Sequence, residues 1–133
     1  MRDPFVTFAA LLAYIQEREK QVNGPANLEP EFSKMLQFLM RYPDLRPRVV
    51  DAFAKALRDK TYGRYMVIQY CMHKLRWPEM LAEAKEAYTE AQNALIKQQL
   101  HGSASQHLSF VEEVIGSFED TWSSRPLFAA YRS

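Results

Sequence analysis

The placement of proline constrains the fold of this chain more than any other feature, because four prolines each precede an amphipathic run. The four pairs are Asp3-Pro4, Glu29-Pro30, Arg46-Pro47 and Trp77-Pro78. Proline is favoured in the first turn of a helix, where the amide hydrogen that it lacks would have no partner, and it disrupts a helix interior. The pairs therefore predict helices that start near residues 4, 30, 46 and 78.

Between these starts, apolar residues recur at spacings of three and four, which is the period of an amphipathic helix. Segments rich in helix breakers separate the runs at 23–27, 42–44, 59–63 and 101–105. We expect six helices and no strand, with the helices at about 4–22, 30–41, 46–59, a fourth within 61–76, 78–100, and a last one that begins at Ser109. Ser109 followed by Glu112 fits a capping box, in which each side chain bonds the other residue's backbone amide.

The chain has the size of one domain. Its 133 residues are 47% hydrophobic and 25% charged, which is typical of a folded globular protein. We therefore predict an all-α single domain of five to seven helices over residues 1–133. Residues 123–133 should form a C-terminal tail whose apolar side chains either pack on the core of the domain or bind a partner. We favour packing on the core, because exposed apolar clusters are uncommon on monomeric proteins. The run from Phe5 to Ile15 is apolar almost all round, so we expect it to form the buried front half of the first helix. Its 11 residues are fewer than the roughly 20 that cross a membrane.

The stretch TYGRYMVIQYCMHKL, residues 61–75, combines tyrosine, cysteine, methionine and histidine in one turn-free run, so it is either an active site or part of the core. On a helix its apolar side chains surround the axis almost completely, which is typical of a central helix buried by several neighbours. Gln69, His73 and Arg76 form a polar stripe that we expect at the wet edge of this helix or in a contact surface. Cys71 and His73 point in nearly opposite directions and cannot pair as nucleophile and base, so we expect Cys71 to fill the core.

No catalytic or cofactor-binding motif is present. The chain lacks the glycine-rich phosphate-binding patterns, the nucleophile elbow and the zinc-protease helix motif, and it has only four glycines. His101 and His107 flank a loop without a nearby Cys or carboxylate, which is short of the three or four ligands of a zinc site. The single Cys71 forms no internal disulfide and favours a reducing compartment. We predict a cytoplasmic protein that is not an enzyme and takes no metal and no cofactor.

Charge is segregated along the chain, although the net charge is only +1. Residues 41–76 have nine basic and three acidic side chains, and residues 77–133 have four and eight. The basic segment suits phosphates or an acidic protein surface, and four glutamates make an acidic ridge on the fifth helix. The alternative is that the two faces pair with each other inside the fold. The candidate partner-binding residues are Arg46, Arg48, Lys55, Arg58, Arg64, Gln69, His73, Arg76, Glu79, Glu83, Glu86 and Glu90.

Two of the proline-led runs can be aligned with one another. Pro47 falls on Pro78 at an offset of 31 residues, and Val49 then falls on Met80. In this pattern residues 44–100 resemble a degenerate HEAT-type helical repeat. The resemblance implies stacked antiparallel helix pairs in a short right-handed solenoid, with an extended binding surface and no chemistry of its own. An irregular helical bundle explains the periodicity equally well.

The absence of catalytic motifs and the segregated charge together favour a binding function, because segregated charge speeds and orients association with a complementary surface. We predict a non-enzymatic protein–protein interaction module, such as a small immunity or inhibitor-type protein that binds one macromolecular partner. The alternative is a nucleic-acid-binding helical domain that uses the basic segment 41–76. Against this alternative stand the near-neutral total charge and the lack of a recognised DNA- or RNA-reading motif. No membrane association is expected.

Overall fold

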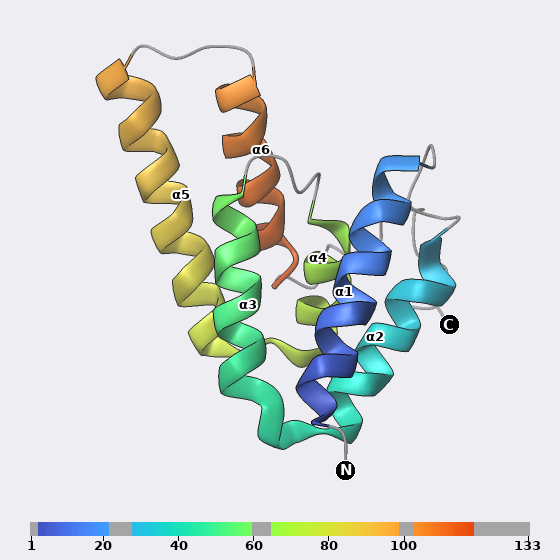
Figure 1. The fold of residues 1–133 in the computed structure, drawn as a ribbon. Coiled ribbons are helices and arrows are strands. Elements are labelled where there is room, and N and C mark those ends of the chain that lie inside the picture. The colour runs from blue at the N-terminus through green and yellow to red at the C-terminus, as the bar shows by residue number, and fades with distance from the viewer. Residues whose placement is uncertain (1–2, 22–27, 60–64, 99–102, 119–133) are drawn as a thin grey trace.

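A computed structural model of the chain describes residues 3–21, 28–59, 65–98 and 103–118. Within these ranges the protein is all-α, as the sequence predicted, and has no strand (Figure 1). The elements are α1 (Pro4–Gln21), α2 (Glu29–Arg41), a 3₁₀ turn η2 (Pro43–Leu45), α3 (Arg46–Arg58), α4 (Met66–Leu75), α5 (Pro78–Gln98) and α6 (Ser103–Gly116). The expected tail, 123–133, lies outside the described residues.

Proline marks the four helix starts that the sequence predicted. Pro4 and Pro78 are the first residues of α1 and α5, while Pro30 and Pro47 are the second residues of α2 and α3. At both of these positions the missing amide hydrogen removes no intrahelical bond. The local sequence therefore determines where these helices begin.

Helix α4 is the centre of the domain, as its nearly continuous apolar surface predicted. Its residues from Val67 to His73 are all buried, and Cys71 is among them as a core residue. Helices α2 and α6 pack on α4, α1 packs on α2, and α5 packs on both α3 and α6. One core contains side chains from all six helices, including Phe8 of α1 and Val111 of α6.

The residues directly before and after α4 both have a left-handed backbone conformation. Tyr65 precedes the helix at φ 58° and ψ 31°, and Arg76 follows it at φ 48° and ψ 45°. The expectation of a turn-free run across 61–75 is therefore wrong at Tyr65, and residues 60–64 lie outside the described ranges. The Tyr65 hydroxyl is hydrogen-bonded to the Asp59 carbonyl oxygen at 3.0 Å and to His107 Nδ1 at 2.8 Å. These contacts hold a buried aromatic side chain on an unfavourable backbone.

The front half of α1 is largely exposed, so the expectation that it would be buried is wrong. Phe8 and Ile15 are buried, but Val6 and Tyr14 are 55% and 48% exposed. Helix α1 lies beside α2 (Figure 1), and its two buried residues, Phe8 and Ile15, are seven apart and share one face of the helix. Its sequence is apolar on more faces than the neighbouring helices cover.

One further expectation, about a helix start, needs correction. Helix α6 begins at Ser103 and not at the expected capping box of Ser109, because the segment 103–108 is already helical. On α2, Phe32 is buried, whereas Met40 is 55% exposed.

Candidate functional site: the groove between α1 and α2

Most of the basic side chains predicted to bind a partner are paired with acidic side chains of the same chain. Arg46 binds the Glu79 carboxylate through two nitrogens, with Nη2 at 2.7 Å from Oε1, and its guanidinium lies 4.9 Å from the centre of the Trp77 ring. Arg58 reaches Glu90 at 2.8 Å. It also lies within 3.4 Å of Glu83 and 4.0 Å of Glu86. The basic face of α3 and the acidic ridge of α5 thus face each other inside the fold.

These pairs alter the acidity of their members. Hydrogen bonds from Arg46 lower the pKa of the Glu79 carboxyl, and those from Arg58 lower the pKa of Glu90. The pKa of Asp3 is lowered first by the Phe5 backbone amide and then by Arg48. Because all these carboxylates are ionised at neutral pH, the pairs connect α5 to α3 and α1 to α3 under ordinary conditions.

The remaining cations of the predicted basic surface divide into three cases. Arg48 lies 3.1 Å from Asp3 and 4.1 Å above the Phe5 ring, so it is occupied by α1 and its flanking residue. Lys55 forms a 3.6 Å pair with Asp51 one turn earlier in α3, and both side chains are highly exposed. Arg64 lies outside the described residues. The partner-binding role of these cations stays a prediction.

The polar stripe of α4 is not at a wet edge, and that expectation is wrong for two of its three members. Gln69 is 4% exposed and His73 is 7% exposed, because α2 and α6 cover this side of the helix. The His73 Nδ1 atom lies 2.9 Å from the Ser117 carbonyl oxygen, which ties α4 to the end of α6. Arg76 is exposed, and its Nε donates to the His73 carbonyl oxygen at 3.0 Å.

Two buried groups outside the predicted surface have reactive side chains but a structural environment. Burial raises the pKa of the Cys71 thiol, so it is protonated at neutral pH and a poor nucleophile. Burial also raises the pKa of the Tyr65 hydroxyl, whose partners are His107 and a backbone carbonyl. Within the described ranges no group of three His, Cys, Asp or Glu side chains is arranged to hold a metal ion.

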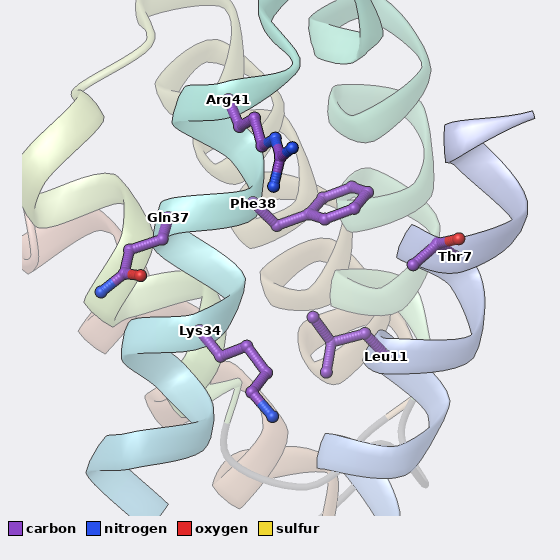
Figure 2. Close-up of a pocket in the computed structure, with 6 residues that line it drawn as sticks. All are labelled: Thr7, Leu11, Lys34, Gln37, Phe38 and Arg41. Atoms are coloured by element: carbon purple, nitrogen blue, oxygen red, sulfur yellow. The ribbon is translucent and has the colours of Figure 1, made fainter.

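An open pocket of about 510 Å³ lies between α1 and α2, away from all of these groups (Figure 2). Helix α1 contributes Thr7 and Leu11, and α2 contributes Lys34, Gln37, Phe38 and Arg41. Phe38 extends from α2 toward α1, and Leu11 extends from α1 toward α2 (Figure 2). Along α2, Phe38 lies between Lys34 and Arg41, while Leu11 lies level with the Lys34 side chain. The pocket therefore has an apolar floor between two cations; we call it the α1–α2 groove.

The two cations of the α1–α2 groove differ from the arginines of α3 in their ion pairing. Among the residues that the structure describes, neither Lys34 nor Arg41 forms an ion pair, in contrast to Arg46, Arg48 and Arg58. Arg41 lies 5.6 Å from the centre of the Tyr42 ring, a contact that leaves its hydrogen-bond donors available. The groove is thus a place where positive charge and apolar surface are both accessible.

The end of the groove nearest the α1–α2 linker has one basic and one acidic side chain. Along α1, Tyr14 and Arg18 continue the row of Thr7 and Leu11 at spacings of three and four, and along α2 Glu31 precedes Lys34 by three residues. Arg18 and Glu31 carry opposite charges and lie toward the linker end of the two helices. The positive charge of the groove therefore rests on Lys34 and Arg41.

Sequence reasoning missed this site, although a signal for it was present. Lys34, Gln37, Phe38 and Arg41 recur at spacings of three and four, which places them on one face of α2. The excess of basic residues in the segment 41–76 led to the prediction of a binding surface on α3 instead.

The sequence matches no protein-family model, and neither a curated protein nor a solved structure is similar to it. No helix within the described ranges is long and apolar enough to cross a membrane. The similarity of residues 44–100 to a HEAT-type repeat stays a prediction. The function is therefore argued from the geometry and chemistry of the chain itself.

Proposed function

We propose that the protein is a non-enzymatic protein–protein interaction module, and that the α1–α2 groove is its binding site. The observation that carries this proposal is the combination of an accessible apolar floor, Leu11 and Phe38, with two cations, Lys34 and Arg41, that form no ion pair with the described part of the chain. Binding surfaces on proteins commonly combine an apolar centre with charged groups at the rim, which orient the partner.

Exposed apolar side chains on the same two helices add support. Val6, Tyr14 and Met40 are each about half exposed, although each is large enough to contribute to a core. Tyr14 continues the row of Thr7 and Leu11 along α1, and exposed apolar surface beside a pocket is typical of interaction sites. A small immunity or inhibitor-type protein in the cytoplasm is the finer form of this proposal, since such proteins bind one partner and need no chemistry of their own.

Nucleic-acid binding through the segment 41–76 is less well supported. Arg46, Arg48, Lys55 and Arg58 each lie beside a carboxylate of the same chain. A phosphate backbone would have to compete with these partners, which lowers the gain from counterion release.

The test of the proposed function uses the full-length chain as bait in an extract of its source organism, followed by identification of what is retained. The complex is then rebuilt from purified components, and its stoichiometry is measured by light scattering and its affinity by calorimetry. We expect one protein partner at a fixed stoichiometry. The proposal fails if no retained protein forms such a complex with the purified chain.

A parallel titration with duplex and single-stranded oligonucleotides at low and moderate salt tests the alternative. We expect weak binding at both salt concentrations. Tight binding that falls steeply with salt, and that is lost when Arg46, Arg48, Lys55 and Arg58 are reversed in charge, would replace protein binding by nucleic-acid binding.

A further inference from the structure

We propose that the occupant of the α1–α2 groove is an acidic amphipathic helix of a partner protein, with two carboxylate side chains seven residues apart and large apolar side chains between them. This inference rests on the proposed function and adds the chemistry and spacing of the partner segment. It follows from three properties of the groove: its charge, the spacing of that charge, and its apolar floor.

The charge of the groove requires an anionic occupant. Lys34 and Arg41 have no acidic partner among the described residues, whereas the arginines of α3 are paired. Carboxylates are the protein groups that bind lysine and arginine, and an arginine can receive a carboxylate through two nitrogens. Both cations are exposed, so a bound carboxylate would not have to be taken fully out of water.

The spacing of the charge selects a helix. Lys34 and Arg41 are seven residues apart on α2, which is two turns and about 10 Å along the axis. A partner helix lying along α2 presents side chains at the same interval when its acidic residues are also seven apart. An extended strand covers about 10 Å in three residues, but three residues place two side chains on opposite faces, so only one carboxylate would reach the groove.

The floor of the groove specifies what lies between the two acids. Phe38 lies between Lys34 and Arg41 along α2, and Leu11 of α1 extends toward the same groove beside Lys34 (Figure 2). Both apolar side chains are only half-buried. On the partner helix, the residues three and four positions after the first acid face the same side as both acids. Large apolar residues at these two positions would cover Leu11 and Phe38 and remove apolar surface from water.

Helices α1 and α2 provide a suitable seat for a third helix. The two helices pack side by side and run in opposite directions (Figure 1). A helix that packs between two neighbours at ordinary interhelical distances of about 8–10 Å contacts both of them. The groove thus offers the geometry of helix-in-groove recognition, in which an amphipathic helix inserts its apolar face.

The experiment measures binding of a fluorescein-labelled synthetic helical peptide to the full-length protein by fluorescence anisotropy. The peptide has an alanine- and glutamine-rich helical background, two glutamates seven residues apart, and leucine and phenylalanine at the third and fourth positions after the first glutamate. A second peptide has lysines in place of the two glutamates, and a third has proline at its centre. We expect the first peptide to bind and the other two to bind at least tenfold more weakly.

Charge reversal in the protein provides the decisive comparison. The double variant Lys34→Glu, Arg41→Glu should bind the glutamate peptide about tenfold more weakly and the lysine peptide more tightly than the native protein does. The matched control Lys74→Glu, Lys97→Glu makes the same change in net charge at two exposed sites outside the groove and should bind as the native protein does. If the charge-reversed protein loses its helical circular dichroism, Lys34→Gln, Arg41→Gln serves instead and should weaken binding in the same direction.

Other occupants give distinguishable results that would overturn the inference. Equal binding of the proline peptide would exclude a helix, and tighter binding of sodium dodecanoate than of the peptide would point to a small amphiphile. Dimerisation that Lys34→Glu, Arg41→Glu abolishes would assign the groove to a second copy of the chain. A purified native partner that binds the double variant as tightly as the native protein would refute this inference while leaving the proposed function intact.

Discussion

Replacement of Arg76 by alanine and by glycine tests the backbone strain at the end of α4. Arg76 is in the left-handed region at φ 48° and ψ 45°, directly after the helix. Its side chain is exposed, and its Nε donates a hydrogen bond to the His73 carbonyl oxygen at 3.0 Å. Both substitutions remove every contact of the arginine side chain beyond Cβ, so the difference between the two variants isolates the contribution of the backbone.

The expected difference follows from two opposing effects. A residue with a Cβ pays about 1–2 kcal/mol in the left-handed region, and glycine does not. Glycine also gains freedom in the unfolded chain, which offsets about 0.4–1 kcal/mol of this advantage. The Arg76→Gly variant should therefore be more stable than Arg76→Ala by about 1 kcal/mol.

The measurement is equilibrium unfolding in urea, followed by circular dichroism, with the slopes of the transitions compared to check that the unfolded states are alike. The matched control is Ala82→Gly, at an exposed position inside α5, where glycine should cost about 1 kcal/mol relative to alanine. The reasoning is refuted if alanine is as stable as glycine at position 76 while the control shows its usual loss.

Three further predictions follow from buried and paired groups. Tyr65→Phe should destabilise the protein by about 1–3 kcal/mol, because it removes the hydrogen bond to the Asp59 carbonyl oxygen and the buried one to His107 Nδ1. Tyr88→Phe, at a half-buried site, should have a smaller effect in the same urea assay. Arg58→Met should cost about 1 kcal/mol at neutral pH and low salt. Because the folded-state pKa of Glu90 is below its ordinary value of 4.5, this cost should be complete above pH 4.5 and shrink as the pH falls through the folded pKa; a pH-independent cost would contradict the ion-pair explanation. Cys71 should react with iodoacetamide only in denaturant, and rapid labelling of the native protein at pH 8 would show that it is not buried.

Much of the secondary structure could be predicted because its signals are local. A proline in the first turn acts through its own ring and missing amide hydrogen, and this rule located the starts of α1, α2, α3 and α5. The spacing of apolar residues that predicted α3 also agrees with the structure, since buried residues such as Phe53 and Leu57 share one face of that helix. The capping-box pattern gave a wrong helix start for α6, because Ser109 lies inside a helix that begins at Ser103.

The candidate site could not be predicted in the same way, because it depends on which helices become neighbours. The sequence shows that Arg58 and Glu90 have opposite charges, but only the packing of α3 on α5 brings them to 2.8 Å. The same packing removes the arginines of α3 from the charge available to a partner. Lys34 and Arg41 have no such neighbour in the described ranges, so the accessible charge lies on α2 instead.

The sequence by itself thus determined the all-α class, the proline-led helix starts and the central place of α4, since each depends on a single segment and its own periodicity. The tertiary structure alone decided how many sides of each helix are covered. An apolar face on α1 is exposed because no described helix packs there, and Gln69 and His73 are buried because α2 and α6 do pack on α4. Periodicity describes the faces of one helix, whereas burial and accessible charge depend on contacts between residues far apart in the chain.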